Sequence, residues 1–341
     1  MTIRGCAGST GVGGMPASEE FAQLTDSFRP ELLAYCYRML GSVHDAEDQV
    51  QETLLRAWRS AGDFEGRASL RTWLYRIATN ACLRAIENRK RRPLPSGFGA
   101  PGEDPQAPPA PDAPEVPWLQ PIPDALFAPG VADPAATVTK RESMRLALIA
   151  ALQYLPARQR AVLILRDVLD WRAAEVAALL DTTTTAINST LQRARTQLDR
   201  ISPTEDDVYE PTDPRQRSLL DRYVAAFETA DIAALMQLLR DDAVLEMPPI
   251  PTWFAGREQV GGFLAAHVLG RSGDFRMVPT AANGQFALGV YVRGHDGLHH
   301  GYGVQVLTIT ASRIARITAF IDADLLATFG LPADLAARAL Q

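Results

Sequence analysis

The sequence predicts a multidomain protein in which two all-α domains, the second with a helix-turn-helix, precede an α+β domain. Three observations carry this prediction. Apolar residues recur at helical spacing over 19–92 and 140–200, a Pro-rich segment separates these blocks, and strand-like alternation fills much of 218–341. The length of 341 residues suits two or three domains, and 47% hydrophobic residues can form real cores, which excludes wholesale disorder.

Composition also limits the kind of protein. The apolar runs are too short to span a membrane, and residues 1–18 read as a flexible leader without a signal peptide, so a cytoplasmic protein is expected. Cys6, Cys36 and Cys82 are odd in number and unclustered, which argues against a disulfide framework and a zinc site. No cofactor, metal ligand or catalytic residue is predicted.

In the first block, residues 19–92, a helix is expected to end at Gly41 and a second to begin near Asp45, with acids in its first turn. The predicted inward stripe of the second helix is Val50, Leu54, Ala57 and Trp58. Its opposite face holds Asp48, Gln51, Glu52 and Leu55. Spacing alone favours simple solvation of that face.

A third helix is expected from about Leu70, and its outer face mixes aromatic and basic residues. Residues 67–92 hold eight basic residues against one acid. Such a face suits single-stranded nucleic acid, although a solvated helix end would show the same charge. The residues concerned are Arg71, Tyr75, Arg76, Asn80, Arg84, Arg89 and Arg91.

Residues 93–139 are predicted to be an acidic, Pro-rich linker. Within it, residues 93–136 contain 13 of the 24 prolines, six acids and no basic residue. This stretch is expected to stay extended, because it buries too little to offset its ordering entropy. It also carries the whole formal net charge of −6, which masks the basic faces on either side.

Residues 140–200 are predicted to form four helices, at about 141–154, 157–168, 172–179 and 184–199. The last two, joined by a turn near Asp181 to Thr183, form a helix-turn-helix, with a threonine capping the final helix. A purely structural hairpin is the alternative. Facing outward within 172–195 are Thr185, Asn188, Ser189 and Gln192 for base edges, with Arg193 and Arg195 for phosphates.

The three motifs DAEDQVQETLLRAW, SLRTWLYRIATNACLRAIENRKRR and LPARQRAVLILRDVLDWRAAEVAALLDTTTTAINSTLQRAR, in this order, closely resemble the extracytoplasmic-function group of bacterial RNA polymerase sigma factors. The resemblance implies that residues 19–92 are sigma domain 2 and residues 140–200 sigma domain 4. It implies that the Asp48 to Leu55 face binds the β′ clamp helices of the polymerase core. It also implies −10 recognition by the Arg71 to Arg91 set and −35 recognition by the helix-turn-helix.

After a second linker at 201–217, residues 218–341 begin with a helical pair and continue as a curved antiparallel sheet. The WFAGR sequence and the closing RITAFID strand resemble the SnoaL-like, nuclear-transport-factor-like cone. Three roles remain open for this domain: catalysis by a histidine or acid, a small ligand in the cone, and a regulatory contact surface. The catalytic candidates are His267, His295, His299, His300, Asp322 and Asp324. Trp253, Phe254 and Arg257 are expected at the cone mouth or at an interdomain contact.

Together these features predict a non-enzymatic alternative sigma factor. Its predicted partners are the RNA polymerase core and promoter DNA, without membrane insertion, and its C-terminal domain is expected to modulate activity. The alternative is a ligand-sensing DNA-binding regulator that carries a SnoaL-like enzyme domain and acts without polymerase.

Overall fold

The computed structural model describes residues 25–61, 69–87, 90–127, 142–201, 214–310 and 313–336. The first helical block consists of α2 (Arg29–Leu40), α3 (Val43–Arg59) and α4 (Leu70–Glu87). Gly41 adopts a φ of 68° and ends α2, as predicted. The Ser42 hydroxyl caps α3 by accepting the Asp45 N–H.

The second block contains the four predicted helices. They are α6 (Leu146–Leu152), α7 (Ala157–Leu163) with a π-helical extension η4 (Ile164–Val168), α8 (Ala173–Leu179) and α9 (Thr184–Ile201). The Thr183 hydroxyl accepts the Ala186 N–H at 3.2 Å, which confirms a threonine cap on α9. Buried Ile187, Leu191 and Ala194 hold α9 against its neighbours. The helix-turn-helix of α8 and α9 is therefore present.

The C-terminal block is an α+β domain. Its helices are α10 (Pro214–Glu228), α11 (Ile232–Leu238), α12 (Arg257–Phe263) with η5 (Leu264–Val268), and α13 (Leu325–Thr328). Its strands are β1 (Leu239–Met247), β2 (Ile250–Ala255), β3 (Phe275–Ala282), β4 (Gln285–Arg293), β5 (His299–Thr310), β6 (Arg313–Phe320) and β7 (Asp334–Leu335). The sheet order is β2-β1-β6-β5-β4-β3, with β7 on β5, and among these described strands only β1 and β6 pair in parallel.

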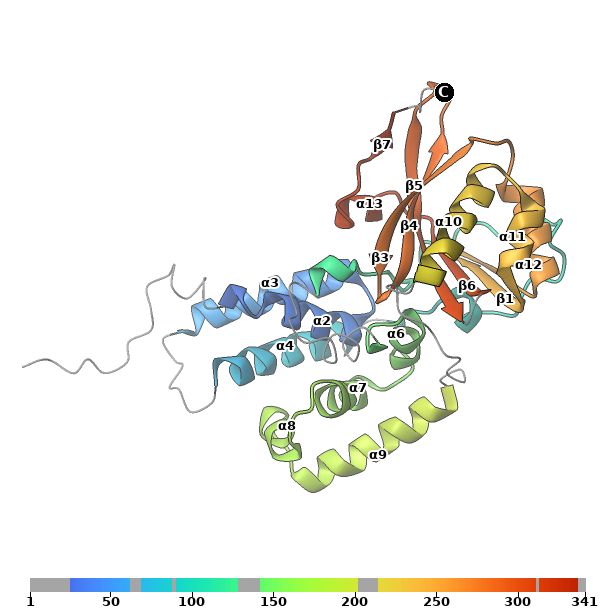
Figure 1. The fold of residues 1–341 in the computed structure, drawn as a ribbon. Coiled ribbons are helices and arrows are strands. Elements are labelled where there is room, and N and C mark those ends of the chain that lie inside the picture. The colour runs from blue at the N-terminus through green and yellow to red at the C-terminus, as the bar shows by residue number, and fades with distance from the viewer. Residues whose placement is uncertain are drawn as a thin grey trace, which may run out of the picture.

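Alternate residues of this sheet enter two different cores. Leu307 and Ile309 of β5 face the helices α10 to α12, whereas Val304 and Val306 belong to the core that also contains the two helical blocks. Figure 1 shows α10, α11 and α12 on one side of the sheet and the two helical blocks beyond its lower end. The outer face of the sheet is thus an interdomain surface.

The linker is not the free tether that its composition predicted. Its described part, residues 93–127, has little regular structure beyond η2 (Pro95–Gly97) and η3 (Asp124–Leu126), but Leu119 and Ile122 are fully buried. The Ser96 N–H donates to the buried Glu246 carboxylate of β1 at 2.8 Å, and Arg316 of β6 donates to that carboxylate at 2.6 Å. A few anchors therefore bind a proline-rich chain that has little conformational entropy to lose.

Candidate nucleic-acid interface

The exposed face of α3 is a mixed polar and apolar surface. Asp48 and Gln51 are exposed, and Glu52 pairs with Arg56 at 2.5 Å. Leu55 is 41% exposed and Trp58 is 52% exposed. The predicted inward position of Trp58 is wrong, because Trp58 lies one turn beyond Leu55 and extends the same face. Two large apolar side chains beside carboxylates are typical of a surface that binds another protein.

The outer face of α4 differs from the prediction at Tyr75. This residue is fully buried, with its ring 5.2 Å from that of Tyr35 and 5.0 Å from that of Trp171. Burial raises the pKa of the Tyr75 hydroxyl. Sequence periodicity placed Tyr75 outside because it could not show that the second helical block covers this side of α4. Arg76, Asn80 and Arg84 are exposed, and Arg89 lies outside the described residues.

Several arginines of this face are held by other parts of the chain. Arg71 pairs with Glu31 at 3.1 Å, and its guanidinium lies 5.5 Å from the Trp171 ring centroid. Arg76 pairs with Asp181 of the helix-turn-helix at 3.0 Å. Arg91 lies 3.9 Å over the Tyr154 ring and donates to the Gly97 carbonyl. The candidate −10 surface therefore contacts the second block and the linker.

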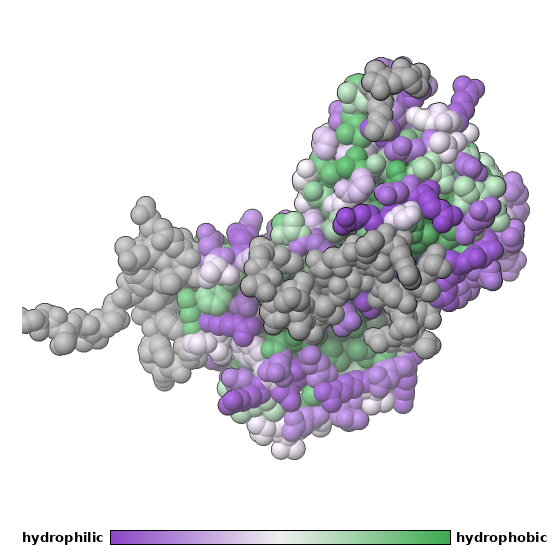
Figure 2. Space-filling model, viewed as in Figure 1, coloured by the Kyte–Doolittle hydropathy of each residue, from purple (hydrophilic) through white to green (hydrophobic). Residues whose placement is uncertain are grey.

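The predicted DNA-reading residues of α9 are all exposed: Thr185, Asn188, Ser189, Gln192, Arg193 and Arg195. Arg193 donates to the Thr190 hydroxyl at 3.1 Å, and Arg195 pairs with Asp167 at 2.7 Å. In the view of Figure 2 the surface over α9 is mostly hydrophilic. A polar outer face on the second helix of this motif can enter a major groove.

Buried arginines join the two helical blocks. Arg38 of α2 donates to the Ser143 hydroxyl at 2.7 Å, and Arg160 of α7 donates to the Met39 carbonyl and to Gln153. Burial lowers the pKa of both arginines to about 10, so both remain charged at neutral pH. Removing one of these hydrogen-bond partners would leave a buried guanidinium with fewer acceptors, which is costly.

The tip of the β3–β4 hairpin reaches the same junction. Asn283, fully buried at a φ of 57°, donates from Nδ2 to the Tyr37 hydroxyl and to the Met144 carbonyl, both at 2.8 Å. Its Oδ1 accepts the Ile122 N–H at 3.0 Å. One side chain of the C-terminal block thus bonds α2, the linker and the segment before α6. We call Asn283 with these three partners the hairpin junction.

The hairpin junction was missed by sequence reasoning, although Asn283-Gly284 is a typical two-residue hairpin turn. That signal predicts the turn but not its partners. Glu246 was missed too, since a carboxylate in a strand usually indicates an exposed position. The hydrogen-bond partners of Asn283 and Glu246 in the linker and the helical blocks are far from them in the sequence, so no local pattern indicates these contacts.

The residues suggested for the cone contact the linker or their own domain. The Trp253 indole donates to the Gly99 carbonyl at 2.9 Å, while Arg257 pairs with Asp241. Phe254 is buried and stacks on Phe263 at 4.6 Å, so it belongs to the domain core. Between the sheet and the helices, buried side chains such as Tyr223, Phe227 and Phe263 pack into one core.

Two helical DNA-binding blocks followed by an α+β cone define a promoter-recognition factor with an added domain. Residues 24–92 match Sigma-70 region 2, residues 145–198 match Sigma-70 region 4, and residues 220–319 match the SnoaL-like domain. The chain is 48% identical over 325 residues to the ECF RNA polymerase sigma factor SigG of Mycobacterium tuberculosis, covering 94% of this chain and 87% of that protein.

A second relative, the ECF sigma factor SigJ of Mycobacterium tuberculosis, is 27% identical over 84% of this chain and 85% of its own length. The crystal structure of SigJ matches with a TM-score of 0.59 at 23% identity, over 91% of this chain and all of that one, which shows a common fold. The chain belongs to the extracytoplasmic-function RNA polymerase sigma factors. It directs polymerase core to promoters, as predicted, and the family is a class of transcription factor, not of enzymes.

Among the described residues, no helix is long and apolar enough to cross a membrane.

Proposed function

We propose that the exposed face of α3, including Leu55 and Trp58, binds the β′ clamp helices of the core. We further propose that α4 recognises the −10 element and α9 the −35 element, through the exposed residues described above. The same proposal places the protein in the cytoplasm and divides the chain at the domain boundaries given above. It assigns no catalysis to the C-terminal domain. The exposure of polar and basic side chains on α4 and α9 supports it.

The C-terminal domain, we propose, modulates activity by holding the sigma domains in a closed arrangement. The supporting observation is the hairpin junction, where buried Asn283 bonds both sigma domains and the linker. The direct contact between Arg76 and Asp181 is exposed and contributes no more than about 1 kcal/mol. Buried hydrogen bonds to three segments are a stronger constraint, since each lost partner costs about 1–3 kcal/mol.

Runoff transcription with polymerase core tests this proposal. The full chain and a chain without residues 211–341 should give transcripts from the same start sites, because the −10 and −35 surfaces lie outside the deleted part. The shorter chain should give more transcript, because the hairpin junction is removed and only the direct contacts between the two helical blocks still oppose their separation. Equal transcript from both chains, at equal core binding, would refute the modulating role.

A further inference from the structure

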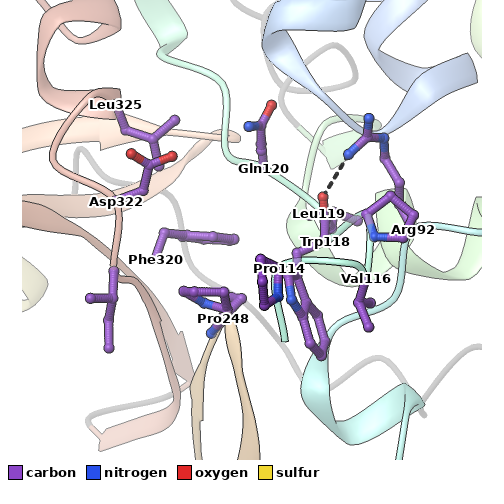
Figure 3. Close-up of a pocket in the computed structure, with 13 residues that line it drawn as sticks. Arg92, Pro114, Val116, Trp118, Leu119, Gln120, Pro248, Phe320, Asp322 and Leu325 are labelled. Atoms are coloured by element: carbon purple, nitrogen blue, oxygen red, sulfur yellow. Dashed lines mark hydrogen bonds between the residues drawn. The ribbon is translucent and has the colours of Figure 1, made fainter. Parts of the chain in front are cut away.

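A cavity of about 290 Å³ lies where the linker crosses the outer face of the C-terminal sheet (Figure 3). It lies outside the cone, and its lining comes from three parts of the chain: the end of sigma domain 2, the linker, and the C-terminal domain. Six of its lining residues carry rings: Trp118, Phe320, Pro114, Pro117, Pro248 and Pro249.

The ring-bearing residues of the cavity wall favour a ligand with a flat apolar ring. Proline rings and aromatic rings are stiff, so the cavity keeps its shape without a ligand, and their faces pack well against another ring. A volume near 300 Å³ is at the lower end for small-molecule sites, which suits one ring system with a short side chain.

The charged residues that line the cavity indicate which polar group its ligand carries. Arg92, the cation of the lining, pairs with Asp45 at 2.5 Å and donates to the Trp118 carbonyl at 2.9 Å. Asp322 is half-buried, and its carboxylate accepts the Asp324 N–H; it has no ion-pair partner among the described residues. Figure 3 shows the Asp322 carboxylate and the Gln120 amide on the same side of the Phe320 ring. A carboxylate beside aromatic faces favours a cation.

We propose that this junction cavity binds a small aromatic amine in its protonated form. The ring lies among Trp118, Phe320 and the prolines, and the ammonium group pairs with the Asp322 carboxylate. Asp322 is therefore a binding residue at the domain junction and not a catalytic acid inside the cone. Because the cavity is shared by the linker and the C-terminal domain, the bound amine stabilises the closed arrangement by linkage. This last consequence rests on the proposed modulating function, whereas the binding site itself does not.

The test uses the full-length protein without polymerase or DNA, so that its outcome is independent of the proposed function. Tryptamine is the probe, with uncharged 3-ethylindole and anionic indole-3-propionate as matched ligands. Titration calorimetry should show saturable binding of one tryptamine per chain, about tenfold or more tighter than either matched ligand. The midpoint of thermal unfolding should rise with tryptamine concentration.

Two variants locate the site. Asp322→Asn should weaken tryptamine binding about tenfold or more, whereas Asp324→Asn, which changes the same charge outside the lining, should leave it unchanged. Val116→Phe should fill the cavity and remove binding while keeping Asp322. Absence of saturable binding to the wild-type chain, equal affinity for the three ligands, or wild-type affinity in both Asp322→Asn and Val116→Phe would overturn the proposal.

Discussion

Asn283 shows how much one polar residue can connect when it is buried with every bond satisfied. Its backbone adopts a left-handed conformation that asparagine and glycine tolerate, and its amide bonds three other segments. Replacement by glycine would keep the backbone conformation and remove the side chain alone. The Ile122 N–H and the Met144 carbonyl would then lose their partner in a buried place.

Asn283→Gly should therefore destabilise the chain by about 2–5 kcal/mol, measured by urea unfolding followed through tryptophan fluorescence. Asn283→Ala should cost about 1–2 kcal/mol more, because alanine is strained in the left-handed region. The comparison of the two variants separates the side chain from the backbone. A glycine variant within about 0.5 kcal/mol of wild type would mean that the hairpin junction holds nothing together.

At the scale of elements, α3 combines a buried stripe with an exposed binding face. Charge reversal of Asp48 and Glu52 to lysine should abolish retention of polymerase core on the immobilised chain, since that face is proposed to meet the clamp helices. Trp58→Ala should weaken retention about tenfold or more, as truncation of a central aromatic does at other interfaces. All these side chains are at least partly exposed, so stability should change little.

Glu103→Lys with Glu115→Lys is the matched control, because it makes the same charge change on exposed linker residues. This control variant should retain core as the wild type does. If both double variants lose core equally, the loss reflects overall charge and not the face of α3.

The helices and strands themselves were largely predictable, whereas their contacts were not. Strand-like alternation within 218–341 predicted a sheet there, and the structure has strands such as β3 and β5, because alternation of side chains survives in any context. The burial of Tyr75 and Trp58 was predicted wrongly. Helical periodicity predicts which residues share one face of a helix, but it does not predict how many neighbouring elements pack around that helix. The linker was predicted wrongly because its high proline content does not show which of the few apolar residues between the prolines are buried in a core.

At the scale of the whole molecule, the surfaces proposed for the two promoter elements lie against each other. Arg76 of the proposed −10 surface pairs with Asp181 of the helix-turn-helix, so the two surfaces are in contact in this arrangement. If these surfaces bind the two promoter elements, we expect binding to core and promoter DNA to separate the two sigma domains. A protein held by a few buried junctions can make such a change when a partner binds the open form better.

Fluorescence energy transfer between Glu87→Cys in α4 and Arg200→Cys in α9 should measure this separation. Both positions are exposed, Cys36 and Cys82 are buried, and Cys6→Ser removes the remaining thiol. Transfer should fall when core is added, because the sigma domains move apart. A control pair within sigma domain 4, Arg172→Cys with Arg200→Cys, should not change.

Asn283→Gly should lower transfer in the α4–α9 pair before core is added, because the hairpin junction is then broken. Unchanged transfer in the core-bound α4–α9 pair would mean that the closed arrangement is also the active one.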